Sequence, residues 1–126
     1  MRIKKIEPGS FYKYDLIVIG DKYGEGRGKT LDEVIQSYVV DVIVRAQGDL
    51  SKTPFKKGEV IEKVEPVGSI WYGKTGDIIV IDYKVYMCVD SEVESMYQRR
   101  TRWMRIRTGG RLTDIYKLYR DGQKKR

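Results

Sequence analysis

The arginines near the carboxyl end are the residues whose type and spacing most clearly suggest a chemical function. Arginine binds phosphate through paired hydrogen bonds and stacks on nucleic-acid bases. Aromatic side chains lie between these arginines, and basic groups combined with flat rings are typical of surfaces that bind single strands or loops. We therefore expect a nucleic-acid-binding segment that contains Arg99, Arg100, Arg102, Arg105, Arg107 and Arg111, with Tyr97 and Trp103 between them.

The positive charge of the chain is concentrated at the same end. The 126 residues carry a formal net charge of +7. Residues 1–96 contain 14 basic and 16 acidic residues, whereas residues 97–126 contain 11 basic and 2 acidic ones. Crowded like charges repel one another unless an anionic partner neutralises them. A nucleic acid is the partner that we expect; an acidic protein partner and a solvated basic tail are the alternatives.

A second chemical pattern is an aspartate two positions before a lysine, at Asp82 and Lys84 in an apolar stretch. The pair resembles the core motif of the PD-(D/E)xK nucleases, whose acid binds a metal ion while the lysine orients the attacking water. The resemblance implies Mg²⁺ as cofactor and Glu33 as a further ligand. No upstream carboxylate has the spacing that this family needs. A metal-dependent nuclease is therefore an alternative to a non-catalytic protein with no cofactor.

Residues 16–30 form a glycine-rich segment that resembles a P-loop. Such a loop holds phosphates on backbone amides, and Lys29 and Thr30 would supply the phosphate-binding lysine and the magnesium ligand. The pattern departs at Tyr23, where the family has its first glycine. We therefore interpret residues 20–28 as a flexible glycine loop ahead of a helix.

Three aromatic residues, Trp71, Tyr86 and Trp103, lie in a stretch that resembles the small β modules of carbohydrate-binding domains and phage structural proteins. In those modules the rings belong partly to the core and partly to the binding surface. We favour the first role here, as core aromatics of a small barrel.

Several kinds of chemistry are excluded by what the sequence lacks. It has no histidine and one cysteine, Cys88, so neither an internal disulfide nor a Cys–His nucleophile pair can form. The absence of asparagine and the abundance of charged residues resemble proteins of hyperthermophiles, and the whole composition is similar to that of small archaeal viral proteins. A virion structural or assembly subunit, and thus a homo-oligomer, is a further alternative.

No apolar run reaches the roughly 18 residues of a membrane span, and the first residues do not resemble a signal peptide. We therefore expect no membrane partner and a location in the cytoplasm, or in a virion if the protein is viral.

The clearest element is a helix at about 31–47. Its apolar residues recur with helical spacing, Thr30 and Glu33 form a capping box, and Gly48 suits the carboxyl end. From Ser91 onward we favour a short helix followed by a hairpin through Gly109 and Gly110, against a strand over 102–108. Strands are predicted over residues 2–7, 11–19, 59–67, 69–72 and 77–89, the last folding back near Asp82.

These elements predict an α+β fold with mainly antiparallel strands, in the form of a small, partly closed barrel of SH3-like or OB-like kind. One amphipathic helix would pack on it. We expect a single domain over residues 1–120 and a frayed basic tail over 121–126.

Overall fold

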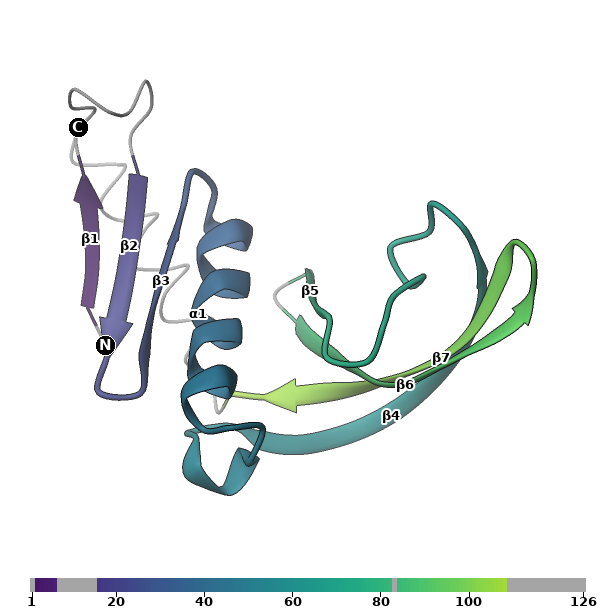
Figure 1. The fold of residues 1–126 in the computed structure, drawn as a ribbon. Coiled ribbons are helices and arrows are strands. Elements are labelled where there is room, and N and C mark those ends of the chain that lie inside the picture. The colour runs from purple at the N-terminus through teal and green to yellow at the C-terminus, as the bar shows by residue number, and fades with distance from the viewer. Residues whose placement is uncertain (1, 7–15, 83, 109–126) are drawn as a thin grey trace. The chain divides into compact units, whose positions relative to one another are not determined.

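The computed structural model describes residues 2–6, 16–82 and 84–108 (Figure 1). The chain forms two compact units, Met1–Phe55 with Thr108–Arg126, and Lys56–Arg107. All strand pairings described are antiparallel, which confirms the α+β class with mainly antiparallel strands. The single domain over 1–120 stays a prediction, and the tail over 121–126 lies outside the described residues.

The first unit is a three-stranded sheet with one helix (Figure 1). Strand β2 (Leu16–Asp21) lies between β1 (Arg2–Ile6) and β3 (Gly24–Gly28). The helix α1 (Leu31–Arg45) packs mainly on β3, and a short 3₁₀ turn, η1 (Leu50–Lys52), follows it. The predicted strands at the start of the chain are thus confirmed where the structure describes them.

Helix α1 confirms the helix prediction and its capping box. Thr30 Oγ1 accepts a hydrogen bond from Glu33 N, and Glu33 Oε2 accepts one from Lys29 N. The helix stops at Arg45, two residues before the predicted end, because Gln47 has a left-handed φ of 54° that no helix can contain. Its apolar stripe is buried and consists of Leu31, Val34, Ile35, Tyr38, Val39 and Val42.

The glycine-rich segment is not a flexible loop but a β-hairpin, so that interpretation is wrong. Its alternate glycines, Gly24, Gly26 and Gly28, face α1. A Cβ atom on Gly26 would lie 2.6 Å from Tyr38 N, closer than real side chains approach a neighbouring atom. The missing side chains therefore allow the helix backbone to lie directly against the strand, a close approach that glycines within strands often permit. This use of the glycines replaces the phosphate-binding role that the P-loop resemblance implied.

The other edge of β3 is covered by side chains of the same helix. From Glu25 to Lys29, just past the end of β3, every second backbone N–H points toward α1, and each successive one meets an acceptor four residues earlier in the helix. Two strand residues and four helix residues both advance about 6 to 7 Å, which is why the two series stay in step. The hydrogen bonds join Glu25 N to Asp41 Oδ2 (2.7 Å), Arg27 N to Ser37 Oγ (3.1 Å) and Lys29 N to Glu33 Oε2 (2.8 Å).

The second unit is a four-stranded antiparallel sheet. Its order is β4 (Lys56–Pro66), β7 (Gln98–Arg107), β6 (Lys84–Ser95) and β5 (Ile78–Ile81), so β4 and β5 form the edges. Neither sheet closes on itself among the described strands, and the closed part of the predicted barrel is therefore not seen there. The fold-back near Asp82 is confirmed as the turn between β5 and β6.

The predicted short helix after Ser91 is wrong, because β6 continues to Ser95 and turns at Met96 and Tyr97 into β7. The strand alternative over 102–108 is correct for the residues up to Arg107. The strand predicted over 69–72 consists of turns instead. Pairing across the hairpin satisfies every second backbone group and buries alternate side chains, and this tertiary gain outweighs a local capping signal.

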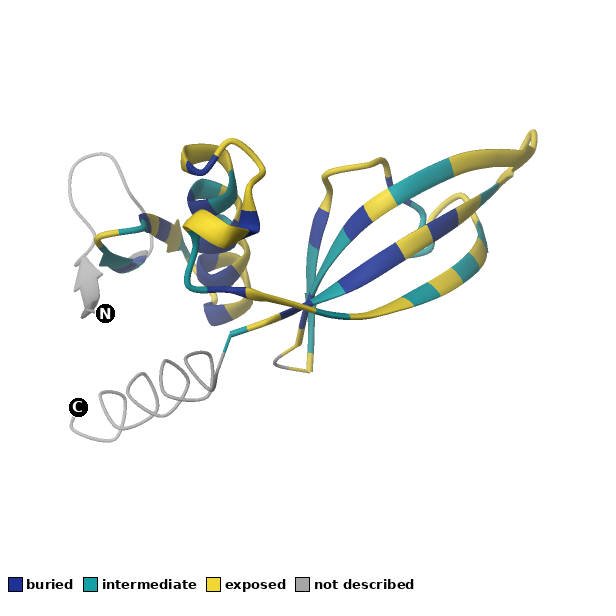
Figure 2. Ribbon diagram, turned by 90° about the horizontal axis from the view of Figure 1, so that it is seen from below, coloured by how far each residue is buried: buried dark blue, intermediate teal, exposed yellow. Residues whose placement is uncertain are grey.

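Buried residues of the second unit lie on both faces of its sheet: Val85, Met104 and Ile106 on one face, and Thr101 and Trp103 on the other, here called the tryptophan face. Trp103 and Thr101 are both 0% exposed, and Cys88 lies beside Trp103 on the next strand. Buried and exposed residues alternate along the strands of this sheet (Figure 2). Trp103 Nε1 donates a 2.8 Å hydrogen bond to Thr101 Oγ1, which in turn donates to the backbone oxygen of Trp71. The segment between β4 and β5 thus folds back over this face and closes the core.

Candidate nucleic-acid interface

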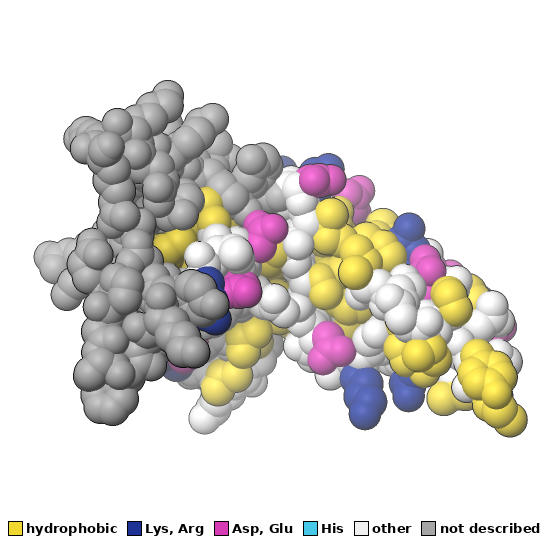
Figure 3. All heavy atoms as spheres, turned by 90° about the horizontal axis from the view of Figure 1, so that it is seen from above, with side chains coloured by type: hydrophobic (Ala, Val, Ile, Leu, Met, Phe, Trp, Pro, Cys, Tyr) yellow, Lys and Arg dark blue, Asp and Glu magenta, His cyan; other side chains and the backbone are white. Residues whose placement is uncertain are grey.

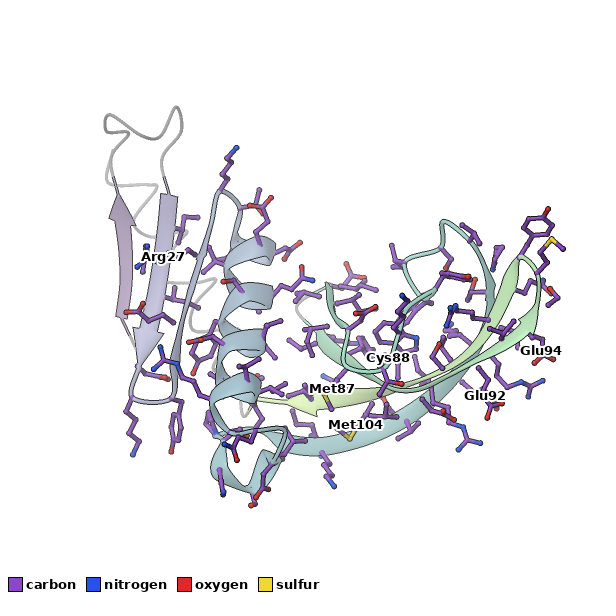
Figure 4. The ribbon with its side chains drawn as sticks, in the orientation of Figure 1. Arg27, Met87, Cys88, Glu92, Glu94 and Met104 are labelled. Atoms are coloured by element: carbon purple, nitrogen blue, oxygen red, sulfur yellow. The ribbon has the colours of Figure 1, made fainter. Side chains whose placement is uncertain are left out.

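The arginines of β7 do not form one surface, because a strand directs successive side chains to opposite faces. The tryptophan face receives Arg99, Arg105 and Arg107. The opposite face carries Met104, which lies beside Met87 of β6 (Figure 4), and is here called the methionine face; it receives Arg100 and Arg102. The continuous arginine cluster expected from the sequence is thus divided into two sets.

Arg100 is already occupied by carboxylates. Its Nη1 lies 3.0 Å from Glu62 Oε1 and its Nη2 lies 3.1 Å from Glu94 Oε1. The hydrogen bond to Glu94, and to a smaller extent that to Glu62, raises the pKa of Arg100. The hydrogen bond between Arg100 and Glu94 also lowers the pKa of Glu94. These two exposed ion pairs add little stability, but they leave Arg100 with little free charge for a ligand.

Arg99 is held by the protein on the tryptophan face. Its guanidinium carbon lies 5.3 Å from the ring centroid of Tyr72, and its Nη1 donates a 3.1 Å hydrogen bond to Ser91 Oγ. Its buried Nε has no hydrogen-bond partner among the described residues. Arg99 therefore belongs to the closure of the core rather than to an open binding surface.

Three other predicted site residues are also placed unfavourably. Arg102 is exposed on the methionine face, where the strand register puts Glu62 on one side of it and Asp90 on the other. Trp103 has no exposed ring face on which a base could stack. Tyr97 is 68% exposed, but at the tip of the β6–β7 hairpin. Arg111 lies outside the described residues.

Two predicted arginines remain open, and the sheet adds two lysines to them. Lys56 is the register partner of Arg107, and Tyr86 is that of Arg105. Lys84 lies two positions before Tyr86 on β6, so its side chain shares the face of Tyr86. All four cations therefore lie on the tryptophan face at one end of the sheet, from three different strands. None of them forms an ion pair with another described residue. This set, the basic end, consists of Lys56, Lys84, Arg105 and Arg107.

Sequence reasoning missed the two lysines because they lie about 20 and 50 residues from the arginines along the chain. Their pattern is visible only when the strand register is known. The carboxylates of β4 and β6 also come beside β7 in the folded sheet. Residues 56–107 contain 10 basic and 8 acidic residues, a net charge of only +2, while residues 108–126 hold a further +4.

The residues of the nuclease alternative do not form a metal site in the described structure. Asp82 is exposed in the β5–β6 turn with a left-handed φ of 50°, and Lys84 opens β6. Glu33 accepts the hydrogen bond from Lys29 N that caps α1. Among residues 2–6, 16–82 and 84–108, there is no group of three or more potential ligands of the His, Cys, Asp or Glu type.

The aromatic residues of the carbohydrate-module resemblance do come together, around the buried Trp103. The Trp71 ring lies 5.2 Å from that of Tyr86 and 5.6 Å from that of Trp103, both nearly edge to face. Lys63 Nζ lies 5.1 Å from the centroid of Trp71. Trp103 is fully buried, which agrees with its interpretation as a core residue, whereas Trp71 and Tyr86 are half-buried at the margin of that core.

No protein-family model, curated protein or solved structure matches this chain. Within the part of the chain that the structure describes, no helix has the length and apolar character needed to span a membrane. The candidate interface is therefore defined by its own side chains, and the basic end is the open cationic group described on the tryptophan face.

Proposed function

We propose that the protein binds nucleic acid, without catalysis, through the basic end of the second unit. The observation that supports this is the meeting of Lys56, Lys84, Arg105 and Arg107 on one face, where none of them forms an ion pair with a described carboxylate, although the bulge of β4 sets Glu59 opposite Arg105. Like charges held together by a sheet repel one another, and a phosphate backbone relieves that repulsion. Strand pairing fixes the spacing of the four cations before a ligand arrives, so little order has to be gained on binding.

The recognition chemistry is mainly electrostatic. Arg105 and Arg107 supply forks that hold phosphate oxygens through two hydrogen bonds, while Lys56 and Lys84 act as point charges beside them. Tyr86 lies next to Arg105, but its ring is half-buried and packs against that of Trp71, so it is not a free stacking surface. Such a site positions a backbone and reads little sequence.

A salt titration with paired variants tests the proposal. A labelled oligonucleotide, single-stranded or duplex, is titrated at several salt concentrations with the wild-type chain and with Arg105→Gln/Arg107→Gln. Each lost phosphate contact lowers the slope of log affinity against log salt by roughly 0.7 to 0.9, so the double variant should lose about 1.4 to 1.8. Its affinity should fall by at least roughly tenfold at low salt.

Arg100→Gln is the matched control, because it removes an arginine of the same strand that carboxylates already neutralise. It should change affinity less than about twofold, since little counterion is released from a paired group. Binding that is absent or independent of salt contradicts the function. A control variant that loses as much affinity as the double variant contradicts this site.

A specific observation also supports the second candidate function, an assembly subunit. The tip of the β6–β7 hairpin exposes apolar side chains, with Val93 at 69%, Met96 at 81% and Tyr97 at 68% (Figure 3). Exposed apolar groups gathered at one point are typical of contact surfaces between proteins. Light scattering of Met96→Ser/Tyr97→Ser tests it; an unchanged particle mass contradicts assembly through this tip.

A further inference from the structure

The outer edge of β4 is an open hydrogen-bonding edge. Among the described strands, β4 pairs only with β7. The corresponding edge of β3 is covered by Glu33, Ser37 and Asp41 of α1, whereas no described side chain covers β4 in this way. Most of β4 is exposed, including Val60 at 54% and Val64 at 46%. Such an edge is a template for another strand.

The hydrogen bond at one end of β4 shows which of its backbone groups point outward. Val67 N donates to Tyr97 O at 3.0 Å, so these residues form a hydrogen-bonded pair with β7. In an antiparallel ladder hydrogen-bonded and non-hydrogen-bonded pairs alternate. The register from Pro66 back to Val60 is unbroken. The N–H and C=O groups of Val60, Glu62 and Val64 therefore point away from β7.

We propose that two copies of this chain associate through β4, antiparallel, about a twofold axis at Ile61. Val60 of each copy then lies opposite Glu62 of the other, and their outward backbone groups form two hydrogen-bonded pairs. Ile61 lies opposite Ile61 as a non-hydrogen-bonded pair, the arrangement in which side chains approach most closely. Two four-stranded sheets become one sheet of eight strands.

Charge selects this register. With the axis at Ile61, Glu59 of one copy lies opposite Lys63 of the other, and the symmetry makes this pair twice. Glu59, Ile61 and Lys63 all lie on the tryptophan face. Ile61 and Lys63 are the register partners of Trp103 and Thr101, and the bulge between Lys57 and Val60 sets Gly58 and Glu59 opposite Arg105. Opposite charges that face each other across strands are stabilising, and like charges are destabilising.

Neighbouring registers bring like charges together. An axis at Glu62 sets Glu62 opposite itself, and an axis at Lys63 sets Lys63 opposite itself. An axis at Val60 moves Lys63 toward Lys57. The bulge at one end and Pro66, which has no N–H, at the other limit the pairing to residues 59–65. The charges on this edge and the length of the segment that can pair thus favour one symmetric dimer through β4.

Sedimentation of the full chain without nucleic acid, over a wide concentration range, tests the proposal. We expect a monomer–dimer equilibrium. Glu62→Pro removes an outward N–H that β7 does not use, and proline is tolerated at such edge positions. Glu62→Ala is the matched control, because both variants lose the ion pair with Arg100. The proline variant should dimerise at least tenfold more weakly than the alanine variant, with an unchanged circular dichroism spectrum.

A charge exchange provides a second, fold-independent test. Glu59→Lys sets lysine opposite Lys63 and should weaken the dimer at least tenfold, and Glu59→Lys/Lys63→Glu should restore it. A wild-type chain that stays monomeric at all concentrations overturns the proposal. So does a dimer that survives both Glu62→Pro and Glu59→Lys, or that is lost instead in Met96→Ser/Tyr97→Ser. Nucleic-acid binding is not needed for any of these outcomes.

Discussion

The backbone N–H of Glu25 donates a 2.7 Å hydrogen bond to Oδ2 of Asp41, sixteen residues later in the chain. Similar contacts join Ser37 to Arg27 and Glu33 to Lys29, the residue that follows β3. The helix thus supplies the hydrogen bonds that a further strand would otherwise provide. An edge covered in this way cannot pair with another chain, whereas the outer edge of β4 has no such cover among the described residues.

Close contact between β3 and α1 predicts that Gly26→Ala is strongly destabilising. The added Cβ would overlap the backbone oxygen of Val34 and lie 2.6 Å from Tyr38 N, and neither backbone atom can move away cheaply. We expect the free energy of unfolding to fall by about 1–3 kcal/mol or more, as overpacked sites do. Urea denaturation followed by helical circular dichroism measures it.

Gly20→Ala is the control for that variant. Its Cβ would meet the Cγ atom of Glu25 at 3.2 Å, and this exposed side chain can rotate away. The change should cost less than about 1 kcal/mol. Equal costs at the two glycines would mean that the contact with the helix is not what requires Gly26.

The edge hydrogen bonds predict that Asp41→Ala lowers the free energy of unfolding by about 0.5–1.5 kcal/mol. The variant loses the acceptor of Glu25 N and the 2.9 Å ion pair with Arg45. Asp41→Asn keeps an acceptor oxygen but no charge, so it should retain most of the stability. Thermal or urea unfolding compares the two; a loss as large in Asp41→Asn as in Asp41→Ala would assign the effect to charge alone.

Because the hydroxyl of Thr101 is buried and hydrogen-bonded, we predict that Thr101→Val destabilises the protein. Its Oγ1 accepts from Trp103 Nε1 and donates to Trp71 O, and valine of the same shape can do neither. The free energy of unfolding should fall by about 1–3 kcal/mol. Thr75→Val makes the same chemical change at an exposed position and should stay within about 0.5 kcal/mol. Tryptophan fluorescence reports the unfolding of this unit.

Because the thiol of Cys88 is buried, we predict that the stability of the protein falls as the pH rises above neutrality. Cys88 is 1% exposed, and desolvation raises its pKa. The thiol of the unfolded chain ionises first, near its ordinary pKa of about 8.5, so stability is unaffected below that pH and falls above it. Cys88→Ala should remove this part of the fall, which begins near the ordinary thiol pKa. A thiol reagent should modify native Cys88 only as fast as the protein unfolds; rapid modification would contradict its burial.

Helix α1 and its caps could be predicted from sequence because the signals are local. A hydroxyl and a carboxylate three residues apart, followed by apolar residues at helical spacing, act within a few turns. The glycines of β3 gave no such local signal. Flexibility and close packing both favour glycine, and only the neighbouring helix decides between them.

The candidate interface shows the same division. The excess of arginine over residues 97–126 is a fact of the sequence, as is the alternation of residues 102–108. The local capping signal at Ser91 favoured a helix. Pairing with β7, where Thr101 is its register partner, makes it part of a strand instead. Only the register then showed that Arg100 meets Glu62, and that Arg105 and Arg107 share a face with Lys56 and Lys84.

By itself the sequence determined the α+β class, the helix and its caps, the lack of histidine chemistry and the amount of positive charge. The tertiary structure decided which charges remain open, which aromatic rings are buried and which strand edge is covered. The physical reason is range. Caps and periodicity act between residues close in the chain, whereas strand pairing joins residues tens of positions apart and assigns each side chain to a face.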